Sequence, residues 1–95
     1  MVVKVIKVFP ISRREYTDRQ NQQQVFKSKG YVLHDGVSSF YAEAIQETAE
    51  SVEVLGVLEG DVVAIGIRCV ARTYTTKESE VRYSNEITLT HMMKL

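Results

Sequence analysis

Residues 61–74 read DVVAIGIRCVARTY, and their pattern is the clearest indication of the fold class. Apolar residues occupy every second position, so that Val63, Ile65, Ile67 and Cys69 share one face of an extended chain. Alternation with a period of two over such a length indicates a β-strand with one buried face. We therefore predict a long strand here, with Cys69 as a small buried hydrophobe on its apolar face.

The rest of the chain is also rich in β-branched and aromatic residues. Four further strands are predicted at residues 2–9 (VVKVIKVF), 24–33 (QVFKSKGYVL), 37–45 (VSSFYAEAI) and 81–93 (VRYSNEITLTHMM). Residues 11–16 can continue the first strand beyond Pro10, which lacks the N–H that a paired strand requires. Asp35-Gly36 lies between two strand-like runs and predicts a hairpin turn.

One segment changes character between the third and fourth predicted strands. Residues 47–55 (ETAESVEVL) begin with an acidic residue, carry Ala49 and Val52 at helical spacing, and precede Gly56, which can end a helix. We predict a short helix, and the alternative is a strand over residues 51–58.

Five strands with a helix between the third and the fourth is the connectivity of the oligonucleotide/oligosaccharide-binding (OB) fold. The predicted fold class is therefore all-β: a five-stranded OB-fold barrel with a short helix between strands 3 and 4. A chain of 95 residues has the size of one domain, so residues 1–95 are expected to form a single OB-fold domain.

The charges are balanced in number but segregated along the chain. The 12 basic and 12 acidic residues give no net charge. Residues 1–33 hold seven basic and two acidic residues, a net charge of +5, whereas residues 34–61 hold seven acidic and no basic residues. Residues 62–95 return to a net charge of +2. Such asymmetry predicts a basic surface and a separate acidic one.

Catalysis finds little support in the sequence. The single Cys69 excludes an internal disulfide and a cysteine-based zinc site, and the spacing of His34 and His91 does not suggest a metal site. No nucleophile–base pair and no glycine-rich phosphate loop is present. We expect no enzymatic activity, no cofactor, no metal and no small-molecule substrate. The absence of an apolar run of membrane length and of a signal-peptide pattern predicts a cytoplasmic protein without a membrane partner.

Several short motifs resemble those of bacterial single-stranded DNA-binding proteins. These are Gly60-Asp61 before the fourth strand, Arg72-Thr73-Tyr74 near its end, and Arg82-Tyr83 opening the fifth strand. The segments KVIKVFP (4–10), VFKSKGYVL (25–33) and HDG (34–36) are similar to those of short, uncharacterised bacterial OB-fold proteins related to that family. The chain departs from the family in lacking tryptophan, which many members use for base stacking. The resemblance implies an OB fold and binding to single-stranded DNA.

Binding to a single strand requires positive charge along the phosphates and flat rings on which bases stack. In an OB fold the loop after strand 1 and the loop between strands 4 and 5 flank the binding face, so the two basic segments can converge in space. The predicted nucleic-acid-binding residues are Arg13, Arg14, Tyr16, Lys27, Lys29, Arg68, Arg72, Tyr74, Arg82 and Tyr83. Phe26 and Lys77 are further candidates, and Tyr31, which is in phase with Leu33, is either a candidate or a core residue.

The predicted function is non-enzymatic, sequence-tolerant binding of single-stranded DNA, with RNA as a possible substitute. The alternative is a protein-interaction or oligomerisation module on the same fold, a dimer or tetramer that buries Tyr74 and Tyr83. The acidic middle segment and the zero net charge favour the alternative. Glu78 and Glu80 place negative charge at the tip of the last hairpin, so contact with a nucleic acid is expected at its base.

Overall fold

The computed structural model describes residues 1–95 as a single curled sheet and one helix. The elements in chain order are β1 (Val2–Val8), β2 (Ser12–Thr17), β3 (Gln23–His34), β4 (Ser39–Ile45), α1 (Gln46–Leu55), β5 (Val62–Thr75) and β6 (Val81–Lys94). The helix α1 has ten residues, which is too short for a helical membrane span.

The strands close into a ring of five. The order in the sheet is β1-β5-β6-β4-β3-β2, and an additional pairing between β1 and β3 joins the two sides, leaving β2 outside the ring and paired only with β3. The pairing of β4 with β6 is parallel, and the other pairings are antiparallel. This arrangement, with the helix between the third and fourth strands of the ring, confirms the predicted all-β OB-type fold.

The predicted first strand is split into β1 and β2. Both strands pair with β3: Val8 of β1 lies opposite Tyr31, and Ser12 of β2 lies opposite Ser28. β2 therefore continues β1 along β3, as the sequence suggested. The break falls at Pro10, which cannot donate a hydrogen bond to the ladder.

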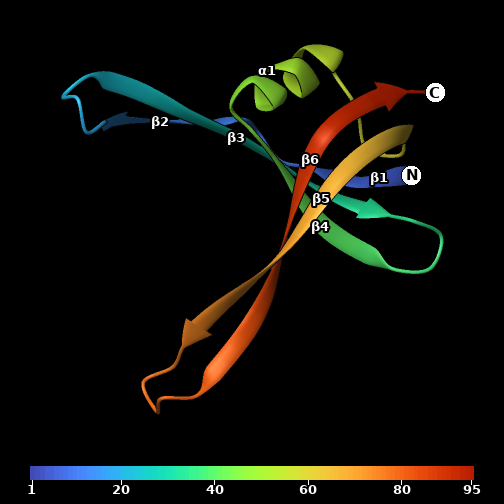
Figure 1. Ribbon diagram of the computed structural model, residues 1–95. Coiled ribbons are helices and arrows are strands. Elements are labelled where there is room, and N and C mark those ends of the chain that lie inside the picture. Colours follow the sequence, from blue (N-terminus) through green and yellow to red (C-terminus); the bar gives the residue numbers. More distant parts are fainter.

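Two hairpins extend beyond the barrel and dominate the shape of the molecule (Figure 1). We call residues 12–28 the β2–β3 arm and residues 69–87 the β5–β6 arm. The radius of gyration is 15.5 Å, against about 12 Å expected for a compact chain of this length. Apart from a few partly covered side chains near its base, each arm is solvent-exposed on both faces.

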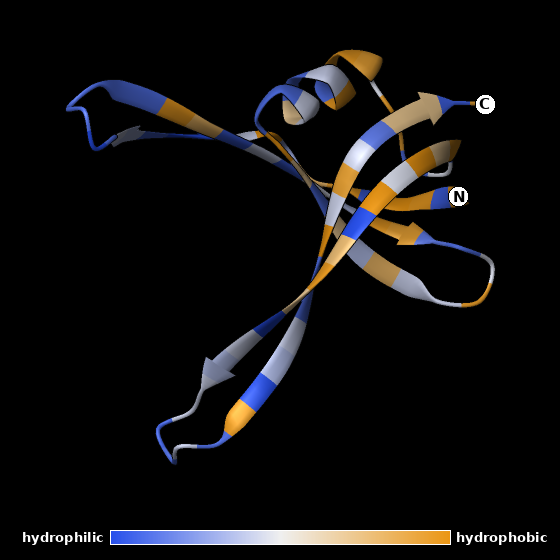
Figure 2. Ribbon diagram, in the orientation of Figure 1, coloured by the Kyte–Doolittle hydropathy of each residue, from blue (hydrophilic) through white to orange (hydrophobic).

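The buried core is small and lies entirely within the barrel and under α1. It contains twelve residues: Val3, Val5, Tyr31, Leu33, Ala42, Ala44, Ala49, Val52, Val57, Val63, Ile65 and Leu89. In Figure 2 hydrophobic colour is concentrated in the barrel, and the arms are mostly pale or blue with isolated orange bands. Tyr31 is therefore a core residue, the second of its two predicted roles.

Cys69 does not occupy the buried position predicted for it. Val63 and Ile65 on the same strand are buried, but the register shifts between Gly66 and Ile67, and beyond that point β5 leaves the barrel. Cys69 is exposed because no element of the chain covers its face of the arm.

The helical interpretation of the segment after the third predicted strand is confirmed. Ala49 and Val52 are buried against the barrel, as their helical spacing predicts. Gly56 ends the helix in the left-handed conformation, with φ 67°, and its N–H donates to the carbonyl of Glu53 at 3.2 Å. The helix packs against β3, β4 and β6. Its acidic side chains also contact cations, Glu50 those of Arg13 and Lys27 and Glu53 that of Lys29.

Candidate nucleic-acid interface

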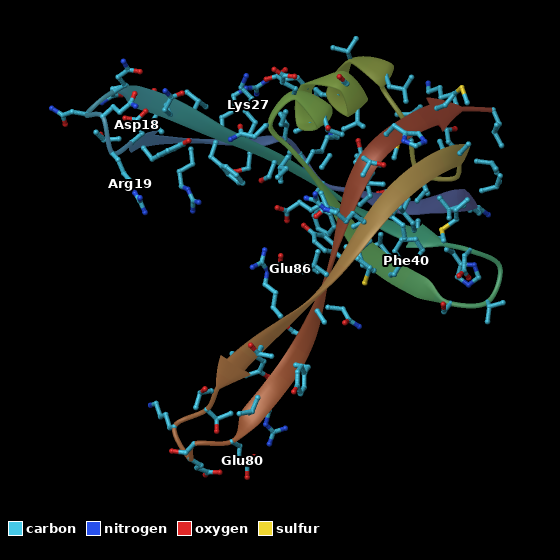
Figure 3. The ribbon with its side chains drawn as sticks, viewed as in Figure 1. Asp18, Arg19, Lys27, Phe40, Glu80 and Glu86 are labelled. Carbon is cyan, nitrogen blue, oxygen red and sulfur yellow. The ribbon has the colours of Figure 1, made fainter.

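A cleft of about 590 Å³ lies at the base of the two arms. Its walls come from β3, β4, β5 and β6: Phe26, Tyr41, Glu43, Ile45, Arg68, Arg72, Asn85, Glu86, Ile87 and Thr88. Figure 3 shows Glu86 on the side of the β5–β6 arm that faces the other arm. The cleft thus combines two rings, two arginines and two glutamates on one concave surface.

Tyr41 is held at the cleft by a glycine on the neighbouring strand. On β4 it alternates with the buried residues Ala42 and Ala44, so its ring points outward. The ring lies over Gly30 of β3, where an added Cβ would come within 2.7 Å of the Tyr41 Cζ atom. Burial, followed by the nearby Glu43, raises the pKa of Tyr41, whose hydroxyl donates to Glu43 Oε2 at 3.2 Å. The sequence signal for Tyr41 is a glycine on the neighbouring strand, and it can be recognised only once the register of β3 and β4 is known.

Tyr41 and Phe26 belong to a longer row of rings and cations. The Phe9 ring meets Tyr41 edge-on, with centroids 5.9 Å apart, and Lys7 Nζ lies 5.1 Å from the Phe9 centroid. At the other end, the Arg14 guanidinium lies 5.7 Å from the Phe26 centroid. We call Lys7, Phe9, Tyr41, Phe26 and Arg14 the aromatic row. Phe9 and Lys7 were not among the predicted residues, because the sequence gives no sign that the segment before Pro10 reaches β4.

The two arginines of β5 that line the cleft differ in their surroundings. Arg72 Nε lies 2.6 Å from Glu86 Oε2, so its charge is already balanced on the arm. Arg68 has no ion-pair partner in the structure, and it lies opposite Thr88, which also lines the cleft. Arg68 is therefore the cation of the cleft that is free to meet an anion.

Three predicted cations contact α1 and do not line the cleft. Arg13 and Lys27 are paired across β2 and β3, and both contact Glu50 of α1, at 3.2 and 3.3 Å. The hydrogen bond from Lys27 and the charge of Arg13 lower the pKa of Glu50. Figure 3 shows Lys27 beside α1. The predicted separation of a basic and an acidic surface therefore does not hold here, because α1 folds its acidic residues onto the basic strands.

Lys29 is the most buried of the predicted cations. It is 8% exposed, and its Nζ lies 2.6 Å from Glu53 Oε2 and donates to the Phe9 carbonyl at 3.0 Å. The same Nζ lies 5.7 Å from the centroid of the buried Tyr31 ring. Burial, together with the charge of Glu53, raises the pKa of Tyr31 to about 12. Lys29 thus anchors α1 to the barrel and is unavailable to an external phosphate.

The remaining predicted residues lie on the exposed parts of the arms. Tyr16 is on β2, on the same side as Arg14. Tyr74 and Arg82 are direct partners on the side of the β5–β6 arm that carries Arg72, and Arg82 contacts Glu80 at 3.0 Å. Tyr83 pairs with Thr73 on the opposite side. Of the predicted residues, Arg68 and Arg72 line the cleft, and Arg14 lies over the lining residue Phe26. Tyr74 is on the same side of the arm as Arg72, and Tyr83 is on the other side.

No group of three or more His, Cys, Asp or Glu residues is placed to hold a metal ion. His34 has a local role, because its Nδ1 accepts a hydrogen bond from the Gly36 N–H at 3.0 Å in the β3–β4 turn.

Comparison with known proteins shows a similarity of fold. No protein-family model and no curated protein sequence matches the chain. Among solved structures, the chain is similar to the NMR structure of the second OB-fold domain of replication protein A from Methanococcus maripaludis. The TM-score is 0.58 with 15% sequence identity, over 99% of this chain and 79% of that chain. At this identity the likeness concerns the fold, and it establishes that the chain has an OB-type fold.

Proposed function

We propose that this protein binds single-stranded nucleic acid, and single-stranded DNA in the first place, in the cleft at the base of its two arms. The observation that carries the proposal is the joint lining of that cleft by Phe26, Tyr41, Arg68 and Arg72. Stacking rings and phosphate-binding cations are the two components that sequence-tolerant single-strand binding requires. The binding is non-enzymatic: the strand is held and no bond is made or broken.

In the proposed complex the strand follows the aromatic row. Bases stack on Phe9, Tyr41 and Phe26, and each stacked base contributes about 1–3 kcal/mol. Phosphates lie against Arg68 and Arg14, which have no carboxylate partner to displace. Every base has a face that can stack, so such a surface tolerates any sequence.

Arg72 can bind a phosphate only after it releases the carboxylate of Glu86. Its 2.6 Å contact with Glu86 is a side-chain ion pair in which both residues are more than half exposed. Exposed pairs contribute about 0–1 kcal/mol, so a phosphate can replace Glu86 at little cost. The carboxylates of Glu86 and Glu43 then act against binding, and they restrict the strand to the path of the rings.

Two further lines of support come from similarity. The Arg72-Thr73-Tyr74 and Arg82-Tyr83 motifs resemble those of bacterial single-stranded DNA-binding proteins. The OB-fold domain with a similar structure belongs to a replication protein. In OB folds generally, the binding face is the one between the two loops that here form the arms.

A protein-interaction module on the same fold is the second candidate. It is favoured by the pairing of five of the seven predicted cations with carboxylates of the same chain: Arg13, Lys27, Lys29, Arg72 and Arg82. Such pairing lowers the charge available to a nucleic acid. The two candidates differ in salt dependence, because only the first requires the release of counterions from phosphates.

The test is an anisotropy titration of dye-labelled oligo-dT and oligo-rU at two salt concentrations. A labelled oligonucleotide is needed because the chain has no tryptophan. We expect binding that weakens with salt, and Arg68→Ala to reduce the slope of log K against log salt by about 0.7, the value for one phosphate of a single strand. Lys27→Gln, on the side of α1, is the matched control and leaves the slope unchanged. Binding that is absent at low salt, or unaffected by salt, would overturn the proposal and favour the second candidate.

A further inference from the structure

Glu43 is the carboxylate of the cleft that has no cation beside it. The other one, Glu86, is held by Arg72 at 2.6 Å, whereas Glu43 takes part in no ion pair. The hydroxyl of Tyr41 donates to Glu43 Oε2 at 3.2 Å, and Oε1 has no hydrogen-bond partner. A carboxylate has room for about four hydrogen bonds and donates none. Glu43 therefore presents unused acceptors to whatever enters the cleft.

The ring of Tyr41 is placed so that a stacked base has Glu43 at its edge. One face of the ring lies over Gly30, where an added Cβ would come within 2.7 Å of the Tyr41 Cζ atom. The residue is nevertheless 51% exposed and lines the cleft, so the other face of the ring is open. A base stacked on this open face lies parallel to the ring, and Glu43, which is hydrogen-bonded to the ring's hydroxyl, then lies beside the edge of that base.

Hydrogen-bond donors follow Glu43 on the next two strands. Thr88 of β6 is the register partner of Glu43 and lines the same cleft. Thr88 in turn pairs with Arg68 of β5, which also lines the cleft. A carboxylate, a hydroxyl and a guanidinium thus lie side by side across three strands. The row offers acceptors at one end and donors at the other.

We propose that this row recognises guanine on the ring of Tyr41. The Watson–Crick edge of guanine carries two adjacent donors, N1–H and N2–H, followed by the acceptor O6. The two oxygens of Glu43 can accept from both donors in a bidentate, charge-assisted pair, and Thr88 or Arg68 can donate to O6. Thymine and uracil present one N–H between two carbonyl oxygens, which a carboxylate repels. Adenine and cytosine present one amino group beside a ring nitrogen that is itself an acceptor.

This inference rests on the proposed binding of a single strand in the cleft and adds a preference to it. Stacking accepts any base, so most positions of the strand remain sequence-tolerant. The charge of Glu43 disfavours a phosphate at the same place, so the part of the strand nearest to Glu43 is a base edge. The preference therefore concerns one nucleotide of the bound strand.

Anisotropy titrations of two dye-labelled oligonucleotides test the proposal: an oligo-dT, and the same oligonucleotide with one dG at its centre. We expect the strand with dG to bind about 5–150-fold more tightly, the range for one bidentate contact to a base. Glu43→Gln is expected to bring the ratio of the two Kd values close to one, because an amide has a single acceptor oxygen. Glu86→Gln is the matched control: it removes a carboxylate that Arg72 already holds, changes both Kd values alike and keeps their ratio.

Base analogues in the wild type locate the contact without a mutation. Hypoxanthine in place of guanine removes only the N2 amino group and is expected to lose much of the preference, whereas 7-deazaguanine keeps the Watson–Crick edge and the preference. Equal Kd values for the two strands, or a ratio that survives Glu43→Gln, would overturn the guanine proposal and leave single-strand binding intact. A preference lost with 7-deazaguanine and kept with hypoxanthine would also overturn it. Absence of binding to both strands would overturn the proposed function itself.

Discussion

Tyr74 and Arg82 are direct partners across the β5–β6 arm, whereas Tyr83, the next residue along the chain, points to the opposite side and pairs with Thr73. The sequence motif Arg82-Tyr83 therefore does not act as a unit. Arg72, which lines the cleft, shares one side of the arm with Tyr74 and Arg82, and Tyr83 lies on the other side. The two tyrosines, both more than half exposed, can serve two separate contacts.

Replacing each tyrosine with alanine separates these contacts. Tyr74→Ala is expected to weaken binding of a short oligo-dT by about 1–3 kcal/mol, the contribution of one stacked base, which corresponds to roughly 5–150-fold in Kd. Tyr83→Ala is expected to change this Kd much less, because Tyr83 is far along the arm and on the side opposite to Arg72 and Tyr74. Anisotropy titrations of both variants provide the measurement, and equal losses for the two would contradict the assignment of faces.

Removal of one carboxylate from the cleft is expected to strengthen binding. Glu86→Gln frees Arg72 from its 2.6 Å ion pair and removes a negative charge from the path of the phosphates. We expect tighter binding of oligo-dT and a salt slope steeper by about 0.7, because one more phosphate is neutralised. Glu80→Gln, at the tip of the arm and paired with Arg82, is the comparison variant and should have a smaller effect. A weaker Kd for Glu86→Gln would show that Glu86 positions Arg72 for binding.

The contact between Lys29 and α1 is expected to matter for stability and not for binding. Lys29→Met removes a short ion pair to Glu53 and a hydrogen bond to the Phe9 carbonyl. Charge-assisted hydrogen bonds contribute about 1.5–3 kcal/mol, and each kcal/mol lowers Tm by about 4–8 °C in a domain of this size. Thermal unfolding followed by circular dichroism measures the loss. Lys27→Met, whose pair with Glu50 is exposed, is the control and should shift Tm much less.

Acid is expected to remove the contribution of Glu50 to the free energy of unfolding. Lys27 and Arg13 hold the pKa of Glu50 below its usual value of 4.5, so the folded protein binds this proton less readily than the unfolded chain. The stabilisation is present above about pH 4.5 and is lost as the pH falls through the lowered pKa. The difference in unfolding free energy between wild type and Glu50→Gln should therefore shrink in acid. Urea unfolding at a series of pH values measures it, and a difference that grows in acid would contradict the role of the two cations.

Much of the fold could be predicted because each element carries its own local signal. Alternation identified β5, and Gly56 identified the end of α1. Burial could not be predicted in the same way, because an apolar face is buried only where another element covers it. Cys69 and Ile65 have the same sequence pattern, and only the departure of β5 from the barrel separates them.

The residues of the candidate nucleic-acid interface were predicted less completely, because the sequence does not show which side of each strand faces the cleft. Arg13 and Arg14 are neighbours in sequence, yet Arg13 contacts α1 and Arg14 lies over Phe26. Charge counts along the chain could not show that Glu50 and Glu53 would neutralise the basic strands. Tyr41 escaped notice because its position depends on Gly30, a residue of a different strand.

The barrel buries apolar side chains and the two arms do not, so the arms are expected to be more mobile than the barrel. Local opening requires least free energy where few apolar side chains are covered, so amide protons in residues 69–75 should exchange with solvent far faster than those of Val63 and Ile65. The cleft then has a rigid base in the barrel and compliant sides in the two ribbons. In the proposed complex, the cleft can adapt its width to purines or pyrimidines without disturbing the core, and the entropy lost in ordering the ribbons sets an upper limit on the affinity.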